Sequence, residues 1–131
     1  MNLLESIFQF LTQTTIVSMR DIMKIAIPTE SGKISPHFGR CEKFVIVEIE
    51  DGKIKNKEIV ENPASGGMHG VGTTAASIIG NYNVNALITQ NIGPKVYNVF
   101  KQLGIEVYKC NTTSIDECVK LFLEGKLEKF E

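Results

Sequence analysis

The feature that most constrains the fold of this chain is a change in the spacing of its apolar residues at Asn62-Pro63. Before this point, short apolar runs alternate with turn residues, which is typical of strands. After it, apolar residues at helical spacing alternate with further strand-like runs. The predicted strands cover residues 24–28, 44–49, 53–60, 84–90 and 105–109, and the predicted helices begin near Val71, Pro94 and Ser114.

Local signals mark several of these boundaries. Asp51-Gly52 is a strong hairpin turn between the second and third strands. Pro94 suits the first turn of a helix that Gly104 ends, and Ser114-Ile115-Asp116-Glu117 is a capping-box pattern that opens a helix closed by Gly125. In that last helix Cys118 falls on the apolar stripe, so we expect it in the core.

The order of elements predicts an α/β domain with a mixed five-stranded sheet and helices on its faces. The third strand carries Lys53, Lys55 and Lys57, charges that protect a sheet edge, so we place it outermost. The expected order is 3-2-1-4-5 in chain numbering. Residues 23–131 would form this single domain, because 131 residues suit one compact core.

Residues 1–22 form a separate N-terminal extension, helical or disordered, in this interpretation. Their apolar residues have helical spacing, but no basic residue precedes Arg20 and the run is too short and interrupted to span a bilayer. Three interpretations stay open: a helix that docks on a partner or associates with itself, a helix packed on its own domain, or an upstream extension before a natural start at Met23.

Charge and cysteine content exclude several classes of protein. The formal net charge is −1 and no run of Lys or Arg is present, which argues against nucleic acid or a charged membrane surface as a partner. The three cysteines, at 41, 110 and 118, form no C-x-x-C pair. An odd number of unpaired cysteines suits a reducing compartment, so we expect free thiols and a cytoplasmic location.

Both histidines of the chain lie in glycine-flanked loops: His37 in Ser35-Pro36-His37-Phe38-Gly39-Arg40-Cys41 and His69 in Gly66-Gly67-Met68-His69-Gly70-Val71-Gly72. In the expected topology, strands one, three, four and five point the same way. The loops that follow them, including Asn91-Ile92-Gly93 and Cys110, would meet at one end of the sheet, where open α/β sheets bind ligands. The two histidines would be neighbours there.

The same edge favours an anion and a soft metal. No Asp or Glu stands between Glu61 and Glu106, while two helix N-termini, Arg40 and Lys95 belong to this region. His37, His69, Cys41 and Cys110 are the candidate metal ligands, with Met68 as a weaker one, and they suit iron, zinc, copper or an iron-sulfur cluster. Each also has a plainer interpretation: a loop histidine can bond only backbone, Cys41 and Cys110 can be buried in packing, and Arg40 can pair with a surface acid.

Enzymatic patterns are poorly supported. Gly70-Val71-Gly72-Thr73-Thr74-Ala75 fits a dinucleotide-binding loop, but Gln90 stands where the ribose-binding acid belongs, and no Walker lysine follows a glycine loop. The first strand holds no carboxylate for a two-metal nuclease. A thiol enzyme that uses Cys41 and a histidine lacks an evident orienting acid.

The motifs Ile25-Ala26-Ile27-Pro28, His37-Phe38-Gly39-Arg40, His69-Gly70-Val71-Gly72, Gly93-Pro94-Lys95 and Leu103-Gly104-Ile105 resemble the dinitrogenase iron-molybdenum cofactor biosynthesis family, which includes NifX, NafY and the C-terminal domain of NifB. The likeness covers about residues 23–131. It implies a three-layer α/β/α, ribonuclease H-like fold and a non-catalytic protein that binds or carries an iron-molybdenum or iron-sulfur cluster or its precursor, exchanged with cluster donor or acceptor proteins.

The resemblance makes His37 the leading candidate for contact with a cluster. The cofactor-binding residues expected around it are His37, Phe38, Gly39, Arg40, His69, Gly70, Gly72 and Gly93. The alternative is a small enzyme or regulatory module that binds an anionic small molecule in the same pocket.

Overall fold

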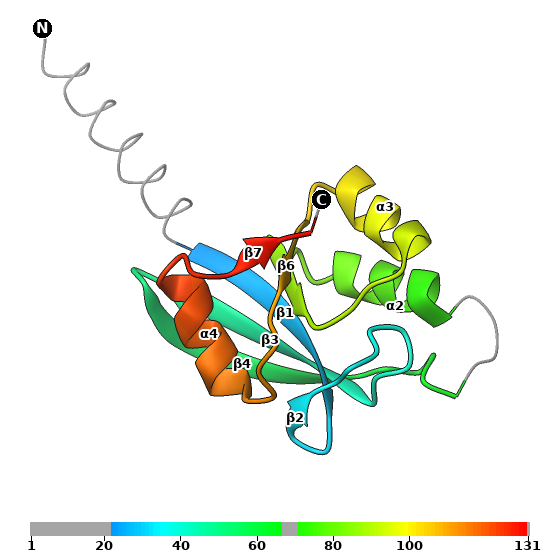
Figure 1. Ribbon diagram of the computed structural model, residues 1–131, viewed down its shortest axis with the longest axis horizontal. Coiled ribbons are helices and arrows are strands. Elements are labelled where there is room, and N and C mark those ends of the chain that lie inside the picture. The colour runs from blue at the N-terminus through cyan, green and yellow to red at the C-terminus, as the bar shows by residue number, and fades with distance from the viewer. Residues whose placement is uncertain (1–21, 67–70, 131) are drawn as a thin grey trace, which may run out of the picture.

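The computed structural model describes residues 22–66 and 71–130. Its elements are β1 (Ile22–Glu30), β2 (Lys33–Ile34), β3 (Lys43–Glu50), β4 (Lys53–Glu61), α2 (Val71–Gly80), β5 (Ala86–Thr89), α3 (Pro94–Gln102), β6 (Glu106–Lys109), α4 (Ile115–Leu123) and β7 (Glu128–Lys129). Figure 1 shows them in one mixed α/β domain.

Within the described residues the sheet has seven strands, not the five expected. Six of the strands lie in the order β4-β3-β1-β5-β6-β7, and the short strand β2 pairs antiparallel with β1 outside this order. The two additional strands, β2 and β7, have two residues each, which is too short to produce a sequence period. β1 runs antiparallel to β3 and parallel to β5, and β6 continues the parallel part.

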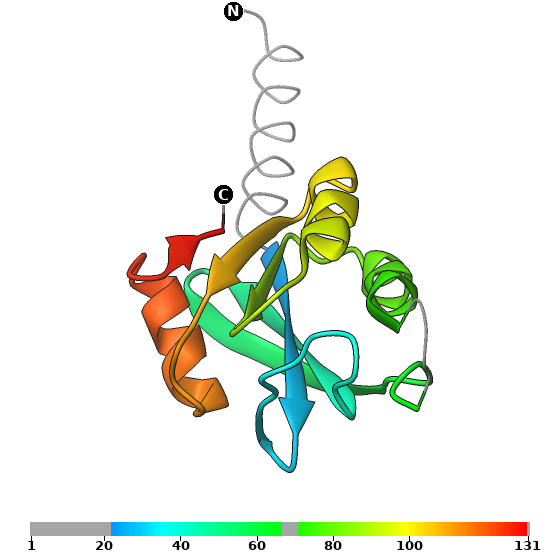
Figure 2. The same ribbon diagram turned by 45° about the vertical axis from the view of Figure 1, so that its right-hand side comes forward.

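Helices cover both faces of the sheet, and the side-chain alternation of the central strands explains why. Ala26 and Leu87 belong to the core cluster that includes residues of α2 and α3, while their neighbours Ile25, Ile27 and Ile88 belong to the cluster that includes residues of α4. A central strand buried on both faces therefore reads as a continuous apolar run. Figures 1 and 2 show α2 and α3 on one side of the sheet and α4 on the other.

The local signals produce the predicted structures. Asp51 and Gly52 have φ angles of 54° and 73°, the left-handed pair that a tight hairpin turn requires. Pro94 occupies the first turn of α3. The Ser114 side chain accepts a hydrogen bond from the Glu117 N–H at 3.2 Å and caps α4.

β4 is the edge strand, as its lysines predicted. Two of its lysines pair within the chain: Lys55 Nζ lies 3.1 Å from Glu50 Oε2, and Lys57 Nζ lies 2.9 Å from Asp116 Oδ1. The lysines therefore lie on an edge strand, where charge protects against pairing with another chain, and two of the three are paired with acidic residues. No helix in the described part of the chain is long and apolar enough to cross a membrane.

Candidate functional site

A pocket of about 580 Å³ lies at the carboxyl end of the parallel strands. β1, β4, β5 and β6 point the same way, so the loops that follow them share this edge of the sheet. The pocket brings together three separate stretches of chain. Its lining residues are Pro36, His37, Phe38, Gly39, Arg40, Val71, Gly72, Asn91, Ile92, Gly93 and Val96.

The segment Ser35–Cys41, called here the His37 loop, is anchored on both sides of an exposed histidine. Before His37, the buried Ser35 hydroxyl donates to the His37 carbonyl at 2.9 Å and accepts from the His37 N–H at 3.2 Å. After it, Phe38 is buried with its ring centroid 5.2 Å from that of Phe100 and 5.7 Å from that of Phe44. His37 itself is exposed at the pocket. The loop therefore presents an imidazole on a fixed backbone.

Two glycines allow the His37 loop to sit against the start of α2. A Cβ on Gly39 would lie 2.8 Å from the Gly72 nitrogen, and a Cβ on Gly72 would lie 2.5 Å from Val96 Cγ2. Both distances are shorter than side chains tolerate. Glycine at these positions therefore lets the loop backbone lie against the backbone of α2, and lets the Val96 side chain of α3 lie against the backbone of α2. This packing closes one wall of the pocket.

The pocket is electrostatically suited to an anion. α2 and α3 both begin at its wall, and neither has an acidic residue in its first turn. The first N–H groups of a helix lack intrahelical partners and carry partial positive charge. The lining residues that the structure describes include Arg40 and His37 but no carboxylate.

Cys41 does not face the pocket as a ligand. Its side chain is fully buried in the same core cluster as Phe38 and Phe44. Burial raises the pKa of the Cys41 thiol from 9.0 to about 12, although the Asn62 side chain nearby opposes the shift. Because a metal binds the thiolate, the prediction of Cys41 as a ligand is not supported; the structure favours the plainer interpretation of a small buried residue.

The prediction of Cys110 as a metal ligand is wrong, and so is the expectation of free thiols for two of the three cysteines. Cys110 and Cys118 form a disulfide, with 6.2 Å between their Cα atoms. Both lie in the core cluster on the α4 face, whereas the pocket-lining Phe38 belongs to the opposite cluster. The cytoplasmic location predicted from free thiols loses that support.

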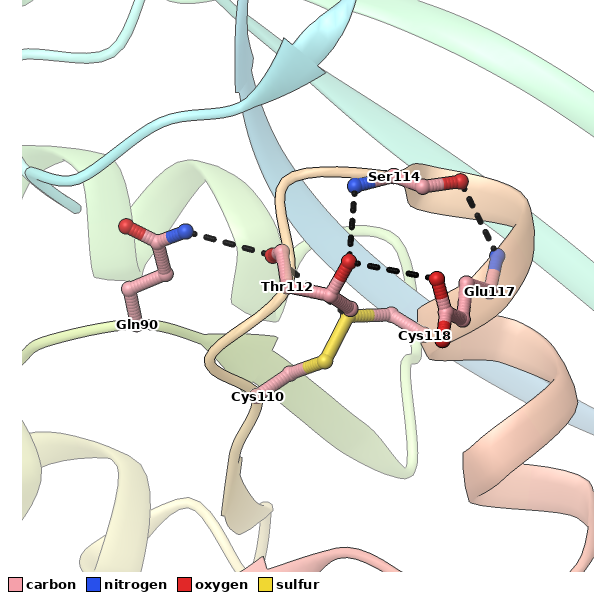
Figure 3. The surroundings of a disulfide bond; sticks show 6 residues. All are labelled: Gln90, Cys110, Thr112, Ser114, Glu117 and Cys118. Carbon is pink, nitrogen blue, oxygen red and sulfur yellow. Dashed lines mark hydrogen bonds between the residues drawn. A yellow bond between two sulfur atoms is a disulfide. The ribbon is translucent and has the colours of Figure 1, made fainter.

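Figure 3 shows the loop that this disulfide closes. The Thr112 carbonyl accepts a hydrogen bond from Gln90 Nε2 at 3.2 Å, and the Ile34 N–H donates to the Thr113 carbonyl at 3.0 Å. Cys110 directly follows β6, at the predicted edge of the sheet, but it takes a structural role in the disulfide on the α4 face.

The other predicted site residues have different outcomes. His37, Phe38, Gly39, Arg40, Gly72 and Gly93 line one pocket. His69 and Gly70, with Met68, lie outside the described residues. Across residues 22–66 and 71–130 no group of three or more His, Cys, Asp or Glu side chains could hold a metal ion.

Sequence reasoning missed Asn62. This side chain is 4% exposed, and its Nδ2 donates to the carbonyl of Gly39 at 3.1 Å and to that of Cys41 at 2.8 Å. The sequence pattern marks Asn62-Pro63 only as the boundary between the strand-rich first half and the alternating helices and strands that follow. The available signal was an asparagine at the end of a strand, because Asn side chains there commonly bond backbone groups.

Comparisons with known proteins agree with this architecture. A family model described as dinitrogenase iron-molybdenum cofactor matches residues 21–125. The protein MJ0580 of Methanocaldococcus jannaschii is 76% identical over 110 residues, which are 84% of this chain and 93% of that protein.

Two solved structures extend the likeness. The crystal structure of MJ0327 from the same organism has a TM-score of 0.71 and 34% identity, covering 84% of this chain and 96% of that one. The apo form of the orange protein from Desulfovibrio gigas has a TM-score of 0.75 and 28% identity, covering 83% and 93%.

Proposed function

Because the chain belongs to the dinitrogenase iron-molybdenum cofactor family, we propose that its pocket binds an anionic metallocluster, of iron-molybdenum or iron-sulfur type, or the precursor of one. The protein would act as a carrier without catalysis of its own and would exchange its cargo with cluster donor or acceptor proteins. We also propose that the fold is the ribonuclease H-like one that the resemblance implies.

The observation that carries the proposal is the composition of the pocket wall. It offers an exposed imidazole, an arginine and two helix N-termini, with no carboxylate among its described residues. A single metal ion held by protein alone requires about four ligands, and the described residues offer no such group. A preformed cluster brings its own sulfide ligands and net negative charge, so it needs few protein ligands and a positive surrounding.

His37 is the proposed contact to the cluster, and His69 is the proposed second one. His69 stands two residues before Val71 in the sequence, and Val71 lines the pocket. Two residues of chain span at most about 7 Å, and this short separation in sequence is the reason for proposing His69 as a second contact. The relative described in its apo form also supports a ligand-bound state of such proteins.

Anaerobic reconstitution with ferrous iron and sulfide tests the proposal. After desalting, the wild-type protein should retain iron and sulfide with charge-transfer absorbance. His37→Ala should retain at least tenfold less, while its free energy of unfolding changes by no more than about 0.5 kcal/mol because the side chain is exposed. The control is Asn111→Ala, an exposed loop residue outside the pocket.

The same experiment separates the alternative, a small enzyme or regulatory module for an anionic small molecule. Helix N-termini bind phosphate or carboxylate as readily as a charged cluster. If the wild type retains no iron, and inorganic phosphate instead raises its Tm in a way that His37→Ala abolishes, the cluster proposal is wrong and the alternative stands.

A further inference from the structure

Asn62 is a buried polar side chain that fastens the end of β4 to the His37 loop. One side-chain nitrogen, Nδ2, donates to two carbonyl oxygens of that loop, those of Gly39 and Cys41. Its Oδ1 accepts from the Ala64 N–H at 3.1 Å, and its own backbone N–H donates to the Glu42 carbonyl at 3.2 Å. The side-chain amide therefore uses both of its polar atoms: Nδ2 bonds a loop about twenty residues earlier in the sequence, and Oδ1 bonds the turn that follows Asn62 itself.

Gly39 is held from two sides by this arrangement. Its carbonyl accepts from Asn62, and its Cα packs against the backbone of Gly72 at the start of α2. His37 and Arg40 flank this fixed point, and both line the pocket. Without the bonds from Asn62, the loop would be held at Gly39 by packing alone.

We propose that Asn62 is a positioning residue for the pocket: its amide fixes the His37 loop so that His37 and Arg40 keep their places at the cargo. The two carbonyl oxygens require a donor, which aspartate at neutral pH and alanine both lack. This inference rests on the proposed function for its purpose, but the fastening of the loop can be measured without any cargo.

Cys41 provides that measurement. It is the last residue of the His37 loop, its side chain is buried, and Asn62 bonds its carbonyl. Among the described cysteines it is the free one, because Cys110 and Cys118 are joined. Opening of the His37 loop would expose its thiol to an alkylating reagent. We expect Asn62→Ala to raise the rate of Cys41 alkylation by iodoacetamide at least tenfold under non-reducing conditions, far below Tm.

Asn85→Ala is the control, at an exposed asparagine that also bonds backbone. The Asn85 side chain also bonds backbone, accepting from the Lys24 N–H at 2.9 Å, but it does so at the opposite end of the sheet, before β5. The Asn85→Ala variant shows how much the loss of one side-chain bond to backbone lowers the free energy of unfolding. It also shows how much that loss raises the rate of Cys41 alkylation through global unfolding. If Asn62→Ala fails to fold, Asn62→Ser is compared instead, because its hydroxyl can still accept from the Ala64 N–H but its single O–H cannot donate to both carbonyl oxygens.

The iron-sulfide reconstitution is run on the same variants. The inference predicts fast alkylation of Cys41 and at least tenfold lower iron retention in the Asn62 variants, with Asn85→Ala close to wild type in both. Equal alkylation rates in Asn62→Ala and Asn85→Ala, after correction for any difference in stability, would overturn it. If the wild type retains no iron, the proposed function fails, and the alkylation rates still decide whether Asn62 fixes the loop.

Discussion

Replacing Gly39 with alanine should separate the His37 loop from α2. The added Cβ would lie 2.8 Å from the Gly72 nitrogen, 2.9 Å from its Cα and 3.0 Å from Val71 Cγ2. Two of these three atoms are backbone, so neither can rotate away. The nearest contact is about 0.6 Å shorter than ordinary van der Waals separation, and the start of α2 would have to move by about that much.

The expected cost is about 1–3 kcal/mol, the usual penalty for overpacking a tightly packed contact. In a domain of this size, 1 kcal/mol lowers Tm by roughly 4 °C. Thermal unfolding of Gly39→Ala, followed by circular dichroism, should therefore give a Tm about 4–12 °C below that of wild type. Iron retention after reconstitution should fall as well, because the displaced wall belongs to the pocket.

Gly93→Ala is the control at the same pocket. A Cβ on Gly93 would meet no atom within 4 Å, and the residue has a φ of −77° that any amino acid adopts. Its stability should stay within about 1 kcal/mol of wild type. A Tm of Gly39→Ala equal to that of Gly93→Ala would refute the argument that glycine at position 39 permits a backbone contact.

Three further predictions follow from single features. Burial raises the pKa of the Cys41 thiol from 9.0 to about 12, so between these pH values only the unfolded state loses this proton. The free energy of unfolding should therefore fall by about 1.4 kcal/mol per pH unit in this range. Denaturant unfolding at pH 8 and pH 10 should show this loss in wild type relative to Cys41→Ala. Reducing the Cys110–Cys118 disulfide, which joins residues 8 apart in sequence, should lower the free energy of unfolding by about 2–3 kcal/mol. Denaturant unfolding with and without a dithiol measures this loss, and Cys41→Ala should respond to the dithiol as wild type does. An unchanged unfolding midpoint would contradict the expected loss. A chain that starts at Ile22, where β1 begins, should keep the Tm and cooperativity of the full chain in calorimetry; insoluble or unfolded protein would show instead that residues 1–21 contribute to the core.

The parts of the fold that local chemistry determines were predictable. Asp51-Gly52, Pro94 and Ser114 each act within a few residues, and each produces the expected turn or helix start. The two-residue strands β2 and β7 were missed because their pairing depends on partners far along the chain. The alternation of apolar and polar residues that indicates a strand needs more than two residues to be recognised.

The candidate site shows a similar limit. Topology placed the His37 loop and Cys110 at the same edge of the sheet, but it could not say which face each side chain takes. Cys110 follows β6 on the α4 face and meets Cys118 of that helix, whereas the pocket lies toward α2 and α3. An asparagine at the end of a strand indicates a bond to backbone, but its partner at Gly39 depends on the tertiary packing of two segments, which neither local pattern specifies.

The three stretches that wall the pocket have a consequence for how the protein persists in the cell. Residues 36–40, 71–72 and 91–96 come together in the folded arrangement, in which β1 pairs with β5 and residues of α2 and α3 share one core cluster, so the unfolded chain has no counterpart of the site. A cargo that binds only the folded state adds its binding free energy to folding, about 2.7 kcal/mol at a hundredfold excess over Kd. The loaded protein would then unfold and be degraded more slowly than the empty one, and its abundance would follow the supply of cargo.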